Sequence, residues 1–428
     1  MKKTSVSRMG PIKKNIYNSN SDIISHLPGN ILEKILMCLP IRVAVRTSIL
    51  SRKWRYVWMK LPQLVFDETF YEGLGGTTHA KLLMIIYQVM LLHRGPLTKF
   101  TICLSGLESC SQIDQLILNV SNKDIHDFTL HMWEGKLYKL PSSLYSCSQL
   151  MHLSLLSCVF KPPPGFEGFT RLLSLDLHDV VISADVLSSL ISSCPLLEDL
   201  TLHSSTSLDS LDVVGPNLKH VYCEGDFKSI CFSNTPHLAS VELFHNKEEI
   251  PSSVVLLDSV PAIEHLGLDY AYMKGIAACG VPTRLPTALN NLKSISLHEI
   301  CFTKRDEVSV LIFLIRSSPN LEDVTIHAYP GPTSASPIGL DFSDVHGWSD
   351  VSLNQLRRVE MKTLSGTKPE LELIKLMLAK SPMLETMLIE LSSQNVADEL
   401  RIVKELTRLR RASPEAEMRF ARPKEDEG

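Results

Sequence analysis

Polar residues that could bind or react recur at fixed positions in the middle of the chain. They alternate with apolar residues in short segments, and side chains of an extended strand alternate between its two faces, so one face would be polar. The positions expected on that face are Ser174, Asp176, His178, Asp199, Thr201, His203, His220, Tyr222, Glu224, Ser240, Glu242, Phe244, His265, Gly267, Asp269, Ser294, Ser296, His298, Asp323, Thr325 and His327. Small polar side chains, acids and histidines suit recognition of a polar or basic protein segment. The residues expected to contact such a target are Asp176, His178, Thr201, His203, Tyr222 and Glu242.

Two pairs of histidines occupy equivalent positions in successive segments: His178 with His203, and His298 with His327. Neighbouring strands lie about 4.8 Å apart, so each pair could be close in space. A metal site or a pH switch would use such a pair. No third ligand follows from the spacing, however, and the favoured interpretation is solvated surface histidines with no bound metal.

The sequence contains none of the usual motifs of catalysis. Gly-x-Ser-x-Gly and His-Glu-x-x-His are absent, and no cysteine lies in a recognisable nucleophile context. The glycines at 73, 75 and 76 are not followed by Gly-Lys-Ser/Thr, so a phosphate-binding loop is not indicated. We therefore predict no catalytic residue, no cofactor and no enzymatic activity.

The polar segments belong to a longer repeating pattern, in which apolar residues stand at the first, fourth and sixth positions. The pattern begins at Leu150, Leu172, Leu197, Leu218, Leu238, Ile263, Leu292 and Leu321, with weaker versions at Leu97 and Ile125. A period of about 20–29 residues is typical of leucine-rich repeats. Each unit would supply a short strand and a returning segment, and the stacked units would share one core and leave a curved strand face exposed. Residues 183–193 have apolar residues at helical spacing, so some returning segments should be helices.

The stretch from residue 22 to 61 predicts three short helices, with Pro28 in the first turn of the first helix and Pro40 ending it. Ser51 is the expected N-cap of the third, which carries Trp54 and Trp58. About 40 residues cannot build a deep core of their own. The apolar stripe of the first helix is therefore expected either to pack against the rest of the chain or to receive a partner's helices. Its residues, together with those leading into it, are Leu27, Pro28, Ile31, Leu32, Ile35, Leu36 and Leu39.

The same stretch resembles an F-box. The motif is carried by Leu27-Pro28, Ile31-Leu32, Ile35-Leu36, Leu39-Pro40, Ala44-Val45-Arg46-Thr47-Ser48, Leu50-Ser51 and Trp54-Arg55. This run is similar to the plant F-box group that also carries leucine-rich repeats and a C-terminal FBD domain. The resemblance implies that the apolar stripe docks onto the Skp-type adaptor of a cullin–RING ubiquitin ligase, and through it onto a cullin.

Phrases near the C-terminus resemble an FBD domain: Leu356-Arg357-Arg358-Val359, residues 371–378, Leu384-Glu385-Thr386-Met387-Leu388-Ile389 and residues 411–417. Read from the residues, this part is strand, helix, strand, helix and strand. Residues 330–350 are rich in turn formers and indicate a boundary. The expected fold is α/β: a three-helix F-box, then a leucine-rich-repeat solenoid with a curved parallel sheet, capped by an α+β FBD domain. The expected divisions are a disordered tail (1–21), the F-box (22–61), linker and solenoid (62–350), the FBD domain (351–421) and a charged tail (422–428).

Charge is unevenly distributed along the 428 residues. Residues 1–60 hold 12 basic and 2 acidic residues, and the remainder holds 43 − 12 = 31 basic against 47 − 2 = 45 acidic residues. A basic N-terminal segment could bind nucleic acid, but basic residues interleaved with an apolar stripe favour binding to an acidic protein surface.

The longest apolar run, residues 82–92, is too short to span a bilayer, and no secretory signal is evident. Ten scattered cysteines without a Cys-x-x-Cys pair favour a reducing compartment, cytoplasmic or nuclear.

Together these patterns predict a substrate-recognition subunit of a Skp–cullin–F-box ubiquitin ligase. The F-box would bind the adaptor and the repeats would bind an unidentified target protein, with no nucleic-acid or membrane partner. Two alternatives stay open: an interaction scaffold that recruits no substrate, and a small-ligand receptor. Ubiquitination of a target that depends on the repeat face would exclude the scaffold, and thermal stabilisation by a metabolite would support the receptor.

Overall fold

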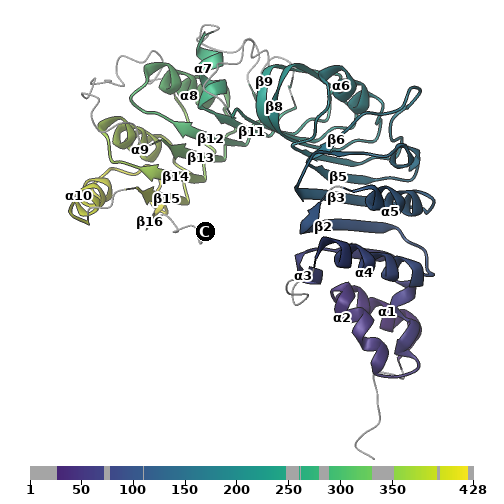
Figure 1. The fold of residues 1–428 in the computed structure, drawn as a ribbon. Helices are drawn as coiled ribbons and strands as arrows, with labels where there is room; N and C mark the ends of the chain where they lie inside the picture. The colour runs from purple at the N-terminus through teal and green to yellow at the C-terminus, as the bar shows by residue number, and fades with distance from the viewer. Residues whose placement is uncertain are drawn as a thin grey trace, which may run out of the picture.

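The computed structural model describes residues 27–71, 78–108, 110–246, 260, 262–278, 289–329, 351–392 and 396–422. These residues form a small helical unit joined to a long arch of parallel strands (Figure 1). The predicted tail (1–21) and the predicted boundary segment (330–350) lie outside the described residues.

The helical unit contains two α-helices followed by short 3₁₀ turns. Its elements are α1 (Gly29–Met37), α2 (Ile41–Arg46), η2 (Thr47–Ile49), η3 (Trp54–Tyr56) and η4 (Trp58–Lys60). Pro28 and Pro40 are the N-cap residues of α1 and α2, one position before the first helical turn. The predicted third helix forms only as η3 and η4, and the N-cap of η3 is Lys53 instead of Ser51. Trp54 and Trp58 are both buried, and they fill the interior of this unit.

The arch is a single 14-stranded sheet in which strand order follows chain order. Its strands are β1 (Gln63–Phe66), β2 (Lys99–Glu108), β3 (Asp127–Glu134), β5 (His152–Leu156), β7 (Ser174–His178), β8 (Asp199–Val214), β9 (His220–Ser233), β10 (Ser240–Phe244), β11 (His265–Asp269), β12 (Ser294–Ile300), β13 (Asp323–Ala328), β14 (Arg358–Leu364), β15 (Thr386–Leu391) and β16 (Glu417–Ala421). Every pairing between them is parallel. A separate two-stranded ladder joins β4 (Tyr138–Lys139) to β6 (Cys158–Val159).

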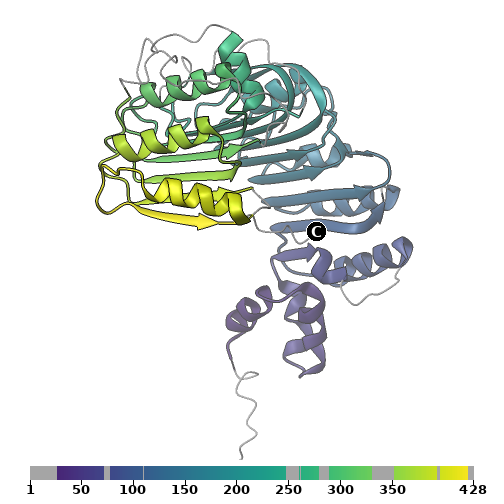
Figure 2. The same cartoon turned by 90° about the vertical axis from the view of Figure 1, so that its left-hand side faces the viewer.

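Helices cover the outer side of the arch, and the strands line its inner side (Figures 1 and 2). The helices of the arch are α3 (Glu68–Tyr71), α4 (His79–Leu92), α5 (Ser111–Ser121), α6 (Ala184–Ser192), α7 (Tyr270–Ala278), α8 (Arg305–Ser317), α9 (Lys368–Lys380) and α10 (Val396–Thr407), with the 3₁₀ turn η5 (Ser142–Ser146). The predicted helix at 183–193 is α6. The repeats of β8 and β9 return without a helix, because both strands continue and stay paired as far as residues 214 and 233.

The repeat pattern forms one continuous core. Leu175, Leu200 and Val221 lie in register on β7, β8 and β9, and all three are buried. The weaker repeats beginning at Leu97 and Ile125 also form strands of this sheet, β2 and β3. The predicted leucine-rich-repeat solenoid is therefore confirmed, and it includes both weak repeats.

The C-terminal segment has the predicted order of strand, helix, strand, helix and strand. It does not form a separate layer: β14 pairs with β13, β15 with β14, and β16 with β15. A capping box starts α9, where Thr367 and Glu370 satisfy each other's backbone N–H groups. The FBD-like segment thus closes the solenoid by lengthening it.

Candidate functional site

The predicted adaptor-binding stripe divides into an inner and an outer face on α1. Leu32 and Leu36 are fully buried, whereas Ile31 and Ile35 are each 37% exposed. Pro28 is exposed, and Leu27 and Leu39 are partly buried against the core. The expectation that Leu32 and Leu36 contact a partner is corrected here, because their side chains hold the unit together. The F-box unit is small, and therefore only one side of α1 is buried in it.

Sequence reasoning missed several exposed apolar residues of the same unit. Val43 lies on α2, Ile49 and Leu50 lie in and directly after η2, and Tyr56 lies on η3. Ile49 is 86% exposed. Exposed apolar side chains gathered on a small unit mark a protein-binding surface. The adjacent pair Ile49-Leu50, flanked by serines, was the available signal in the sequence.

Exposed basic residues alternate with these apolar positions along the chain. Arg46, Arg52 and Arg55 are exposed. Lys53 is exposed too, and its ammonium donates to the carbonyl oxygen of Leu27 at 2.5 Å, which holds the start of the unit in place. The outer face of the F-box unit, formed by these exposed residues, therefore carries both apolar side chains and positive charge.

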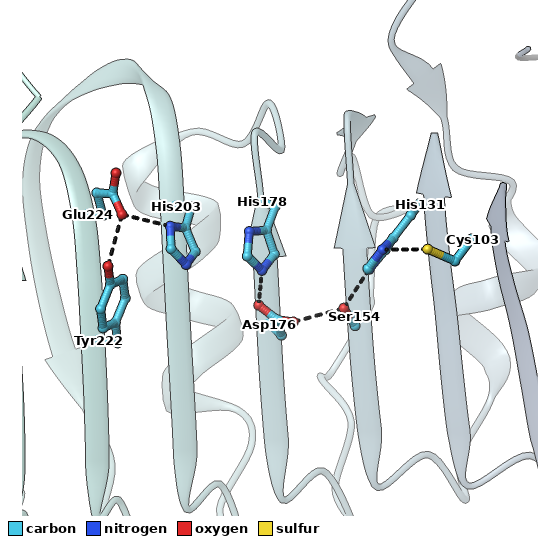
Figure 3. A network of polar contacts seen from close by, with 8 residues as sticks. All are labelled: Cys103, His131, Ser154, Asp176, His178, His203, Tyr222 and Glu224. Carbon is cyan, nitrogen blue, oxygen red and sulfur yellow. Dashed lines mark hydrogen bonds and ion pairs between the residues drawn. The ribbon is translucent and has the colours of Figure 1, made fainter. Parts of the chain in front are cut away.

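The second candidate surface is the inner, concave face of the arch, where side chains on neighbouring strands stack (Figure 3). The rings of His178 and His203 lie 4.2 Å apart between centroids and are inclined by 14°. The rings of His298 and His327 lie 4.4 Å apart and are inclined by 24°. The predicted proximity of both histidine pairs is confirmed, and each pair is a stacked pair.

One hydrogen-bonded chain crosses four strands, from β2 to β7 (Figure 3). Cys103 Sγ lies 3.4 Å from His131 Nδ1, and His131 Nε2 lies 2.9 Å from Ser154 Oγ. The Ser154 hydroxyl donates to Asp176 Oδ2 at 2.9 Å, and His178 Nε2 lies 2.7 Å from Asp176 Oδ1. Burial lowers the pKa of His131, so its ring is neutral near pH 7. This chain holds the predicted residues Asp176 and His178 in fixed orientations.

A second group centres on Glu224 of β9. His203 Nδ1 lies 3.0 Å from Glu224 Oε2, and the Tyr222 hydroxyl donates to the same oxygen at 2.9 Å. Burial and this hydrogen bond raise the pKa of Tyr222, so its hydroxyl keeps its proton. On β10, the hydrogen bond from His265 lowers the pKa of the Glu242 carboxyl, which is therefore ionised. The predicted residues His203, Tyr222 and Glu242 thus lie on one face.

Two differences from the sequence-based picture concern this face. Sequence reasoning missed His131 and Ser154, although the weak repeat at Ile125 places His131 in register with Leu156 and, one strand further, with His178. Asp269 was expected on the face, but it is buried and accepts the backbone N–H groups of His245, Ala271 and Tyr272. Asp269 therefore starts α7 instead of meeting a partner. Thr201 stays in the row, in register between Asp176 and Tyr222.

Within the described ranges, no three histidine, cysteine or acidic side chains gather as a metal site would require. None of the helices described combines the length and apolar composition needed to cross a bilayer.

Comparison with known proteins gives two family matches. Residues 24–65 match the F-box domain model, and residues 113–326 match the model described as "FBD-associated F-box protein At5g56370, LRR repeats". The chain is 38% identical to F-box/FBD/LRR-repeat protein At1g13570 of Arabidopsis thaliana, over 93% of this chain and 98% of the relative. It is 26% identical to FBD-associated F-box protein At5g56370 of the same plant, over 93% of this chain and the whole of the relative. With an F-box unit, a leucine-rich-repeat arch and a C-terminal segment that extends it, the chain belongs to the plant F-box/FBD/LRR-repeat family.

Proposed function

We propose that this protein is the substrate-recognition subunit of a Skp–cullin–F-box ubiquitin ligase. F-box domains generally bind Skp-type adaptors, and the outer face of the F-box unit would hold such an adaptor here. The inner face of the arch would hold the target protein. The chain would contribute no active site, and its effect on rate would come from holding the target near a ubiquitin carrier.

The observation that carries the proposal is the apolar outer face of α1 and η2. Ile31, Ile35 and Ile49 are exposed on a unit whose core is already filled by Leu32 and Leu36. The exposed part of each side chain adds little to the fold of this unit, but it would gain free energy by burial under a partner. The adaptor-binding residues proposed here are therefore Leu27, Pro28, Ile31, Ile35 and Leu39, extended by the exposed apolar residues of α2, η2 and η3.

The test is co-expression of the full chain with a Skp-type adaptor, comparing the native chain with an Ile31→Asp/Ile35→Asp variant. Two carboxylates placed under the adaptor would be desolvated without partners, so we expect affinity to fall by about 100-fold or more. In the free protein both residues are 37% exposed, so the new carboxylates can reach water and the variant should stay folded, with a smaller loss of stability than a charge at Leu32 or Leu36 would cause. Affinity is measured by co-purification and by titration of the isolated adaptor.

A matched control is Met84→Asp/Leu91→Asp on α4. These side chains are 59% and 80% exposed, so they are at least as accessible as Ile31 and Ile35, but they lie outside the F-box unit. The control variant should bind the adaptor as the native chain does. Adaptor binding by a folded Ile31→Asp/Ile35→Asp variant at native strength would contradict the proposal.

A further inference from the structure

The inner face of the arch is an open sheet face with an uneven distribution of charge. Strand register defines three rows of outward positions from β3 to β11. Apart from the inward Asp269, the described positions are Asp127, Thr129, His131, His152, Ser154, Leu156, Ser174, Asp176, His178, Asp199, Thr201, His203, His220, Tyr222, Glu224, Ser240, Glu242, Phe244, His265 and Gly267. Carboxylates stand on β3, β7, β8, β9 and β10, and none of these positions is lysine or arginine.

Positive side chains stand in these rows on the flanking strands: Lys99 on β2, in register with Asp127, and Arg358 and Lys362 on β14. Arg358 on β14 pairs with Asp323 at 2.6 Å, and Lys362 pairs with Glu360 at 3.2 Å. Asp323 and Glu360 therefore each have a positive partner within the protein. Asp176, Glu224 and Glu242 instead contact histidine, serine and tyrosine side chains, so their charge is available to a partner of opposite sign.

A row of packed aromatic and imidazole rings, the ring ladder, runs from β7 to β10 and continues on β12. Successive centroids from His178 through His203, Tyr222, Phe244 and His298 lie 4.2, 4.8, 5.3 and 4.9 Å apart. The stacked pair His178 and His203 covers one ring face of each, which leaves ring edges for contact. Each of these two rings is also held by a carboxylate, Asp176 or Glu224. Side chains fixed in this way lose little conformational entropy when a partner binds.

From the ring ladder and the charge of this face, we propose that it recognises a basic, extended and unphosphorylated segment of the target, with arginine or lysine pairing with Asp176, Glu224 and Glu242. This inference rests on the proposed function and adds the chemistry of the target. Each of these carboxylates already accepts a bond within the protein, and each has two oxygens with further lone pairs. All three side chains are about one-third exposed, so a cation could reach them on the inner face of the arch.

The geometry also limits the spacing of the basic residues. Asp176 lies on β7 and Glu242 on β10, three strands apart, which corresponds to about 14 Å. An extended chain covers that distance in about four residues. The recognised segment would therefore carry two or three basic residues within about five positions. A nucleic acid or a phosphorylated peptide would bring phosphates against these carboxylates and would be repelled.

The test uses the full chain with its adaptor and three fluorescein-labelled peptides. The first peptide is Arg-Gly-Ser-Arg-Gly-Ser-Arg, the second has Glu in place of each Arg, and the third is the first with both serines phosphorylated. Because the face is negative, the arginine peptide should bind about tenfold or more tightly than either other peptide, and its affinity should fall as salt rises. Affinity is measured by fluorescence anisotropy.

An Asp176→Asn/Glu242→Gln variant removes two charges while keeping the shape of both side chains. It should bind the arginine peptide about tenfold more weakly, whereas the matched control Glu167→Gln/Asp185→Asn, exposed and outside the strand rows, should bind as the native chain does. Equal binding of all three peptides, or equal loss in the control variant, would overturn the inference. Adaptor binding reports separately on the proposed function, because it depends on the F-box unit and should be unchanged in both variants.

Discussion

The F-box unit and the inner face of the arch present contrasting surfaces, although we propose both as binding surfaces. The F-box unit exposes isoleucines on α1 and η2 and also carries exposed arginines. On the inner face of the arch, half-buried carboxylates and imidazoles on neighbouring strands are joined by hydrogen bonds. An apolar surface gains its affinity mainly from burial, whereas an array of fixed polar groups discriminates between partners by charge and hydrogen bonding. This difference fits a constant partner at one end of the molecule and a selected partner at the other.

The largest expected effect tests whether α1 has a buried and an exposed side, by placing the same charge at two neighbouring residues. Leu36→Asp would bury a carboxylate without a partner in the F-box core and should destabilise that unit by about 3 kcal/mol or more. Ile35→Asp should destabilise the unit much less, because Ile35 is 37% exposed and its carboxylate can reach water. Hydrogen exchange of α1 amides in the two variants measures the difference. Equal protection in both would show that α1 does not have distinct inner and outer faces.

A smaller effect concerns the second stacked histidine pair, on the C-terminal limb. Burial first, and then the neighbouring His298 and Lys362, lowers the pKa of His327 to about 4. Since the unfolded chain takes up this proton near pH 6.5, the neutral ring contributes stability above that pH, and the contribution is lost as the pH falls toward 4. His327 is only half-buried, so solvent screening reduces the expected loss to about 1 kcal/mol.

This pH effect is measured by urea unfolding of the native chain and a His327→Gln variant at pH 7 and pH 5. The native chain should lose more stability than the variant between the two pH values. The same loss in both proteins would mean that the ring at position 327 is protonated alike in the folded and unfolded states.

The smallest expected change in stability is that of Ile49→Ser. At 86% exposure this side chain has few contacts to lose, so the unfolding free energy should change by less than about 0.5 kcal/mol. Adaptor affinity should nevertheless decrease, because an apolar contact of the proposed interface is removed. Paired measurements of melting temperature and adaptor titration check this. A marked loss of stability with unchanged affinity would place Ile49 among the structural residues.

The sequence predicted the solenoid well because its period is long and its leucines are regular. The repeat starting at Leu172 could be aligned with the one starting at Leu197, and their shared register predicted that His178 and His203 are close, although not that their rings stack. The two faces of α1 could not be predicted, since a helical stripe containing both Ile35 and Leu36 is wider than the surface that this small unit buries.

Other features depended on contacts between distant residues. Asp269 occupies an outward position by its spacing, but the start of α7 directly after β11 turns it toward three backbone N–H groups. The bond from Ser154 to Asp176 joins residues 22 apart and follows only from the register of β5 and β7. The turn-rich composition of 330–350 indicated a domain boundary, whereas β14, the next strand in the chain, pairs directly with β13 in the same sheet.

The order of the strands has a consequence for how the protein is made. Because every strand of the large sheet is added beside the one before it, each repeat can complete its pairing as soon as it leaves the ribosome. Until β16 is synthesised, however, the growing sheet ends in an unpaired edge that other chains could join. Among the described strands that edge is the short strand β16, where exposed Arg419 and Glu417 pair at 2.7 Å. A short edge strand with charged side chains discourages pairing with other chains, so we expect the sheet to be less open to such pairing once β16 is in place.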